Sequence, residues 1–171
     1  LEPSLQTIHF DKLSKKIFGY YWSQTIYFDL EQSPNPQKRP EIYQIVVEEI
    51  ERYRSQYGYQ PQWFSRIENK VDVPIKKISS ILTKDVCWRF PKVGRTTYKL
   101  YDLDKKNRTI SLQNPSLLVD YSKVLFDLIN YRWTQKLEEF NHSPRISKKV
   151  RGTDREDIKR SSLTKYKKYL D

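Results

Sequence analysis

Apolar side chains recur at steps of three and four along residues 41–57, which is the period of an amphipathic helix. The apolar positions of this segment are Ile42, Ile45, Val46, Ile50 and Tyr53. Glu41 at its start and Arg54 near its end have the charges that the helix dipole favours. Gly58 follows as the expected C-terminal cap, so the pattern predicts a helix that ends just before this residue.

A second helical pattern covers residues 72–85, with Pro74 in the first turn, where proline is well tolerated. One side of this predicted helix is apolar, through Ile75, Ile78, Ile81 and Leu82. The other side is polar and contains Lys76, Lys77, Ser79, Ser80 and Lys84. A short helix is expected between the two long ones, over residues 62–69.

The period changes from helical to two after Asp85, which is typical of β-strands. Val86, Trp88 and Phe90 then share one face, while Cys87 and Arg89 point away from it. The predicted strands cover residues 86–90, 97–103 and 108–112. The turns between them are residues 92–96, centred on Gly94, and residues 104–107.

The remaining segments are an aromatic stretch, a proline-rich loop, a long helix and a polar tail. Residues 17–30 are densely aromatic, and both a helix and a buried strand are compatible with them. Residues 32–40 contain three prolines, which exclude regular structure. Asn114 and Pro115 predict the start of a long helix that ends at about residue 141. A short helix is expected in the tail from about residue 162.

Three helices followed by a small antiparallel sheet, between residues 41 and 112, is the element order of a winged helix. The expected fold is therefore α+β, mostly helical, with a winged-helix-like three-stranded sheet. The expected parts are an aromatic segment and linker (1–40), a winged-helix-like core (41–113), and a long helix with a basic C-terminal segment (114–171). The third helix, residues 72–85, would be the recognition helix, and residues 94–96 would form the tip of the wing.

The distribution of charge favours a polyanionic partner. The chain has a net charge of +11, and all of the excess positive charge follows residue 65. Because basic side chains release counterions from phosphates, we expect this part to bind double-stranded DNA. The candidate contacts in the core are Lys76, Lys77, Ser79, Ser80, Lys84, Arg89, Lys92 and Arg95. Those of the C-terminal segment are Arg145, Lys148, Lys149, Arg151, Lys159 and Arg160.

Other interpretations of the same residues remain open. A winged helix can serve as a joint between proteins, and lysines on a helix are often only its solvated side. The basic C-terminal segment could be a flexible tail without a fixed partner. The aromatic residues 17–30 could form a surface for a protein partner, and the oligomeric state is not specified by the sequence.

Composition excludes several classes of protein. Aromatic residues make up 14% of the chain, which is too many for a disordered segment, so a packed core is expected. Cys87 is the only cysteine, which excludes an internal disulfide and a cysteine-based zinc site. No apolar run approaches the roughly 20 residues of a membrane span. We see no secretion leader, and a cytoplasmic location is expected.

Candidate catalytic residues are few. His9 and His142 have no paired ligand spacing, and there is no glycine-rich phosphate loop. Glu68 and Lys70 have a spacing found in one nuclease metal site, but no upstream acid in a strand accompanies them. Asp102 and Asp104 could hold a metal, although a polar turn explains them better. No catalytic site and no metal site are therefore expected in this chain.

Several blocks of sequence are distinctive in combination. The first contains Phe-Gly-Tyr-Tyr-Trp (residues 18–22) and Ser-Pro-Asn-Pro (33–36). The second contains Lys-Asp-Val-Cys-Trp-Arg-Phe (84–90) and Leu-Tyr-Asp-Leu-Asp-Lys-Lys (100–106). The third contains residues 130–141, from Asn-Tyr-Arg-Trp onwards, Ser-Pro-Arg-Ile-Ser-Lys-Lys-Val (143–150) and residues 162–171. Together these blocks resemble the N-terminal region of a family of prokaryotic HNH (His-Asn-His) endonuclease proteins.

The resemblance implies a DNA-holding part that positions a metal-dependent nuclease module. In that family the module follows the segment that resembles residues 163–171, and it brings cysteine pairs for zinc and a histidine that activates water beside a divalent ion such as Mg²⁺. No catalytic residue of the family can be assigned to this chain. The alternatives are a stand-alone winged-helix regulator or replication initiator, and a magnesium enzyme built on Asp102, Asp104 or Glu68.

Overall fold

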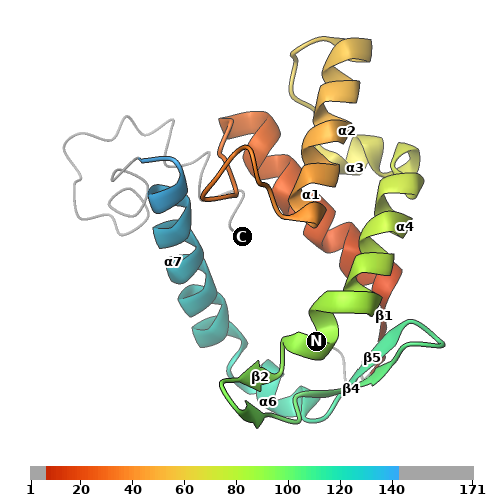
Figure 1. Ribbon diagram of the computed structural model, residues 1–171, viewed down its shortest axis with the longest axis vertical. Coiled ribbons are helices and arrows are strands. Elements are labelled where there is room, and N and C mark those ends of the chain that lie inside the picture. Colours follow the sequence, from red (N-terminus) through yellow and green to blue (C-terminus); the bar gives the residue numbers. More distant parts are fainter. Residues whose placement is uncertain (1–6, 143–171) are drawn as a thin grey trace.

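The computed structural model describes residues 7–142 (Figure 1). The first half is a three-residue strand followed by helices: β1 (Thr7–His9), α1 (Phe10–Phe28), α2 (Glu41–Tyr57), α3 (Phe64–Ile67), a 3₁₀ turn (Glu68–Lys70) and α4 (Asp72–Ile81). The second half contains a π-helical turn (Leu82–Val86), α5 (Cys87–Arg89), β2 (Lys92–Val93), β3 (Thr96–Thr97), β4 (Tyr101–Asp104), β5 (Thr109–Leu112), α6 (Pro115–Asp120) and α7 (Ser122–Phe140). The expected α+β class, mostly helical with a three-stranded antiparallel sheet, is confirmed.

The aromatic stretch forms α1, which lies at the centre of the molecule between α2 and α4. Phe18 and Trp22, one helical turn apart, are fully buried and stacked, with their ring centroids 5.9 Å apart. The indole of Trp22 donates a hydrogen bond to the carbonyl of Gln62, so its polar atom is satisfied. Of the two structures compatible with residues 17–30, the helix is therefore the one that forms.

One hydrophobic cluster runs through the described residues and crosses the expected boundary at residue 40. Phe10, Phe18 and Trp22 of α1 belong to the same cluster as Ile50 of α2 and Ile78 of α4. Burial of these large side chains is the main favourable contribution to folding. The aromatic N-terminal helix is thus part of the core that supports the predicted recognition helix.

The three-stranded sheet has the order β1-β5-β4, with both pairings antiparallel. Ile110 on the central strand lies opposite both Ile8 and Leu103, and it is buried in the common cluster. The predicted strand at residues 86–90 is wrong, because this segment is helical. The strand that completes the sheet is β1, which comes from the other end of the described chain.

The helix predicted over residues 72–85 is confirmed from its start and continues further than expected. At its end the amide of Cys87 donates to the carbonyl of Leu82, five residues earlier, which is the hydrogen bond of a π-turn. This turn contains one residue more than a turn of α-helix. It therefore places Cys87 on the same buried side of the helix as Ile78 and Leu82. Val86, Trp88 and Phe90 remain exposed. Because these apolar residues occur at every second position, the segment has the sequence pattern of a strand although it is helical.

The helix predicted from Pro115 is broken into α6 and α7 at Tyr121, whose backbone has φ −101° and ψ 10°. The predicted start at Pro115 and the predicted end near Asn141 are confirmed. Asn114 occupies the cap position, but its side chain makes no capping hydrogen bond there. Helix α7 contacts the rest of the protein through its C-terminal half, where Leu137 packs with Leu30.

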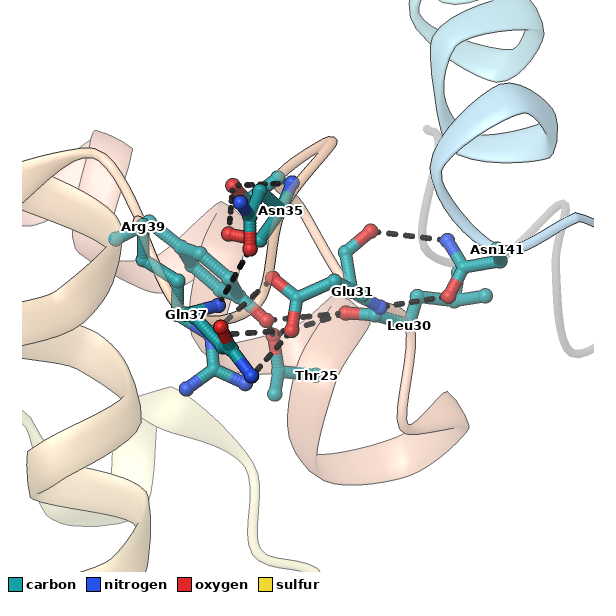
Figure 2. Close-up of polar contacts among 9 residues, drawn as sticks. Thr25, Leu30, Glu31, Asn35, Gln37, Arg39 and Asn141 are labelled. Carbon is teal, nitrogen blue, oxygen red and sulfur yellow. Dashed lines mark hydrogen bonds and ion pairs between the residues drawn. The ribbon is translucent and has the colours of Figure 1, made fainter.

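The proline-rich segment is irregular, as predicted, and is held firmly at both ends. Glu31 forms an ion pair with Arg39, whose two nitrogens donate to the same carboxylate at 2.7 and 3.0 Å. The side chain of Asn141 accepts from the amide of Glu31 at 2.8 Å and donates to its carbonyl at 2.9 Å. Figure 2 shows that these contacts join the end of α7 to the loop between α1 and α2.

Candidate nucleic-acid interface

The outward side of α4 is basic. Lys76 and Lys77 of α4 are exposed, as is Lys84 of the π-helical turn that continues the helix, and Ser80 is half-buried. The opposite side of the helix is anchored in the core by Ile75 and Ile78, which fixes the direction in which the lysines point. No acidic residue occurs between Asp72 and Asp85, so the row of lysines is uninterrupted along the helix.

Ser79 does not lie on this outward side, and its predicted contact with DNA is wrong. Its exposed fraction is 0%, and its hydroxyl accepts a hydrogen bond from the guanidinium of Arg108. The same guanidinium forms an ion pair with Asp11 of α1 at 3.2 Å. Ser79 is therefore a structural residue that connects α4 to the β4–β5 hairpin.

The β4–β5 hairpin is fixed next to α4 through Arg108. The backbone of this residue is left-handed, with φ 55°, and its carbonyl accepts from the amide of Phe10 at 2.8 Å. Its contacts to α1 and α4 hold the turn of residues 105–108 in place. Lys105 and Lys106 are exposed at this turn, so they add positive charge to the part of the protein that Arg108 joins to α4.

Lys105 and Lys106 are not among the DNA contacts predicted from the sequence, where residues 104–107 form a polar turn. The signal was present, since two adjacent lysines between two predicted strands match the position of a wing tip. Asp104 does not pair with these lysines. Its carboxylate accepts from the amide and the side chain of Asn107, at 2.9 and 2.7 Å, and these hydrogen bonds lower the pKa of Asp104.

The turn predicted as the wing tip belongs to a separate two-stranded hairpin, β2–β3. Gly94 has φ +60° there, which a residue with a side chain rarely adopts, and Arg95 is exposed beside it. The hairpin lies next to a cation–aromatic cluster. The Nζ atom of Lys92 and the guanidinium carbon of Arg89 lie 4.4 and 5.0 Å from the ring centre of Trp88.

Arg89 also forms an ion pair with Asp85 at 2.9 Å, one helical turn earlier. Part of its charge is therefore balanced within the protein, whereas Lys92 and Arg95 have no ion pair among the described residues. Of the three predicted contacts Arg89, Lys92 and Arg95, the last two are therefore better placed to bind a phosphate.

Acidic residues of α2 border one side of the lysine row. A surface groove is lined by Glu41 and Glu48 of α2, by Lys77 of α4, and by Lys84 and Asp85 of the π-helical turn that follows α4. Carboxylates repel a phosphate backbone, so this border disfavours an approach of DNA over α2. On the side of α4 that joins the β4–β5 hairpin, the charge of Asp11 is balanced by Arg108, whereas Asp104 at the turn stays negatively charged.

The second predicted group of contacts lies outside the described residues. It consists of Arg145, Lys148, Lys149, Arg151, Lys159 and Arg160. The predicted contacts within the described residues lie on α4, on the π-helical turn that follows it, on α5 and on the β2–β3 hairpin.

The described residues contain no group of three or more histidines, cysteines or carboxylates that could hold a metal ion. Glu68 forms an ion pair with Lys15 at 3.2 Å, and Asp102 accepts a hydrogen bond from the side chain of Gln113. His9 caps α1, with its Nδ1 accepting from the amide of Asp11 at 3.1 Å. Each of these three candidate catalytic or metal-binding residues thus makes a contact within the fold.

Burial reduces the reactivity of the one cysteine. Cys87 is buried, and burial raises the pKa of its thiol, so that the protonated form persists at neutral pH. Its carbonyl accepts a hydrogen bond of 2.5 Å from the hydroxyl of Tyr101. Both residues line an apolar cavity of about 560 Å³, which also contacts Phe90, Leu100 and Leu117.

Helices in the described part of the chain are all too short or too polar to cross a membrane. A comparison with models of protein families, with curated proteins and with solved structures found no match to this chain.

Proposed function

We propose that this chain binds double-stranded DNA through the outward side of α4. The observation that carries the proposal is the row of exposed lysines, Lys76, Lys77 and Lys84, on a helix whose other side is buried. An α-helix fits the width of the major groove, and lysines at its outer side reach phosphates on both edges of that groove.

The β4–β5 turn supplies a second contact in this proposal. Lys105 and Lys106 are presented at the turn, and Arg108 keeps the turn in a fixed position relative to α4 through Ser79. A preorganised pair of basic elements loses less conformational entropy on binding than two mobile ones. The carboxylates of Glu41 and Glu48 direct the duplex away from α2 and towards this hairpin.

The DNA-binding part would position a metal-dependent nuclease module of the HNH type within the same protein. The support for this second half of the proposal is the resemblance of the sequence blocks. The divalent metal and the zinc of such a module would be held by residues of that module, since the described residues have no group suited to either ion. The basic residues from Arg145 onwards would then follow the phosphate backbone between the two parts.

Charge reversal at one lysine tests the DNA-binding surface. We expect Lys76→Glu to weaken binding to a labelled duplex by about tenfold at low salt, because one phosphate contact is lost and a repulsion replaces it. The control is Lys136→Glu on α7, another exposed lysine with the same change in charge, although this one forms an ion pair with Glu139. Equal effects of the two substitutions, or none, would show that α4 is not the binding surface.

A further inference from the structure

A surface groove between α1 and α3 is lined by basic and aromatic side chains together. Helix α1 contributes three lysines and Tyr20 to the lining, and α3 with the residue before it contributes Phe64 and Trp63. The groove has a volume of about 600 Å³, within the range of roughly 300–1,000 Å³ that is common for ligand sites. It shares no residue with the DNA-binding surface proposed above, and we name it the α1–α3 groove.

The α1–α3 groove has an excess of positive charge. Lys15 forms an ion pair at 3.2 Å with Glu68, the one acidic residue of the lining. Lys12 and Lys16 are exposed, and neither has an ion pair within residues 7–142. These two ammonium groups are therefore available to an anion that enters the groove.

Lys12, Lys16 and Tyr20 form a row along α1. They follow one another at steps of four, so they lie on one side of the helix and span about 12 Å along its axis. Tyr20, at the end of the row, is 56% exposed. The opposite side of α1 is anchored in the core by the fully buried Phe18, which fixes the direction of the row.

Packing also fixes the α3 side of the groove. The ring of Trp63 packs against Tyr27, with the ring centroids 5.2 Å apart, and the side chain is still 37% exposed. Gly19 lets α3 approach α1 closely, because a Cβ atom at this position would lie 2.9 Å from the ring of Phe64. Both aromatic walls are thus in place before any ligand binds.

Lysines beside exposed aromatic rings have the chemistry that binds a single strand of nucleic acid. Lysines neutralise its phosphates, and aromatic side chains stack on its unpaired bases, which a duplex keeps within its own stack. An acidic protein segment would neutralise the lysines but would offer no base to the exposed rings.

We propose that the α1–α3 groove binds an unpaired stretch of a nucleic-acid strand, with phosphates at Lys12 and Lys16 and a base stacked on Tyr20. Titrations with oligothymidylate and oligouridylate of equal length distinguish DNA from RNA as the source of the strand. The inference goes beyond the proposed binding of duplex DNA and uses other side chains, so either can fail without the other.

Fluorescence anisotropy of a labelled oligothymidylate of about ten nucleotides, with the full chain, tests the proposal. Tyr20→Ala should raise the dissociation constant by about tenfold, because one base loses its stacking partner, and should leave the circular dichroism spectrum unchanged. Tyr20→Phe keeps the ring and should keep the affinity within about twofold. The matched control is Tyr121→Ala, since Tyr121 is 57% exposed and lies between α6 and α7. Equal effects of the two alanine variants, or none, would overturn the proposal.

The salt dependence of the same binding tests the two lysines. Lys12→Gln with Lys16→Gln should make the slope of the logarithm of the binding constant against the logarithm of salt concentration shallower by about 1.4, because each phosphate of a single strand contributes about 0.7. The control is Lys38→Gln with Lys123→Gln, which removes two exposed lysines from other segments and should leave the slope unchanged. The same slope in both double variants would show that Lys12 and Lys16 contact no phosphate.

Binding of a labelled duplex separates this inference from the proposed function. Tyr20→Ala should leave the affinity for the duplex unchanged within about twofold, because paired bases are not free to stack on a side chain. Lys76→Glu should weaken the duplex complex and reduce the affinity for the single strand by less than Tyr20→Ala does. Equal losses of single-strand and duplex affinity in Tyr20→Ala would contradict stacking on an unpaired base.

Discussion

The guanidinium of Arg108 donates a hydrogen bond to the buried hydroxyl of Ser79, and so joins the β4–β5 hairpin to the inner side of α4. Asp11 of α1 balances the charge of the same guanidinium at 3.2 Å. The position of the lysines at the hairpin turn relative to those on α4 is therefore set by a contact that is itself inaccessible to DNA.

Removal of the Ser79 hydroxyl should destabilise this junction. We expect Ser79→Ala to lower the free energy of unfolding by about 1–2 kcal/mol, because a hydrogen bond from a charged donor is lost at a buried site. Urea denaturation measures the change. Ser80→Ala, one residue further along and half-buried, should change stability by less than about 0.5 kcal/mol. Equal stability of the two variants would argue against a structural role for the Arg108 contact.

Asn141 should control the attachment of α7. Its side chain makes two hydrogen bonds to the backbone of Glu31 and a third to the carbonyl of Leu137, at 2.8 Å. We expect Asn141→Ala to increase amide hydrogen exchange along residues 122–140, because the helix loses its polar anchor to the loop. Mass spectrometry of exchanged peptides measures this effect.

Amide exchange of α4 is the internal reference for this experiment. Helix α4 has no contact with Asn141, so its protection should be unchanged in Asn141→Ala. A second variant, Asn141→Asp, keeps the acceptor for the Glu31 amide but loses the donor to its carbonyl, and should give an intermediate increase. Uniform loss of protection over the whole chain would show that Asn141 supports global folding and not the attachment of one helix.

Alkaline pH should destabilise the protein through its buried tyrosines. Burial raises the pKa of Tyr101 from 10.0 to about 12. Since the folded pKa is above the unfolded one, the stabilisation is complete below about pH 10 and is lost as the pH rises from about 10 to 12. Burial also raises the pKa of Tyr21 and Tyr43, in the same direction.

Urea denaturation at a series of pH values measures this loss of stability. Tyr101→Phe removes one titrating group, so its free energy of unfolding should fall less steeply above pH 10 than that of the unmodified chain. Its stability at pH 7 should be lower, because the hydrogen bond to the carbonyl of Cys87 is lost. Identical pH profiles for the two proteins would contradict the raised pKa.

Cys87 should react slowly with thiol reagents in the folded state. It is 5% exposed, and burial raises the pKa of its thiol, so both access and the thiolate fraction are reduced. We expect the rate of reaction with a chromogenic disulfide to rise steeply at the urea concentration where the protein unfolds. Fast labelling in the absence of urea would show that the thiol is accessible.

Local pattern was sufficient to predict α2 and α4. In residues 41–57 the apolar period is sustained over the entire segment, and the charges and Gly58 mark its ends. The helical period of residues 72–85 also indicates that Ser79 is buried, because Ser79 follows Ile75 by four residues and precedes Leu82 by three. Those steps place it on the buried side with its neighbours, so the error lay in grouping it by polarity instead of by helical position.

Other features could not be predicted from local sequence. Strand β1 has three residues, and only its pairing with β5, about a hundred residues later, defines it. Residues 86–90 fit a strand and a helix equally well over so short a length, and the π-turn that decides between them depends on the burial of Cys87. The contacts of Arg108 join the β4–β5 hairpin to α1 and α4, and they form only once these three elements have packed together.

The salt dependence of binding to a labelled DNA duplex tests the central claim most directly. If the lysines of α4 and of the β4–β5 turn neutralise phosphates, the logarithm of the binding constant will fall linearly with the logarithm of salt concentration, with a slope of about −0.9 for each phosphate contacted. Lys76→Glu should make this slope shallower by about one contact. Binding that does not depend on salt, or no binding at low salt, would contradict the proposed function.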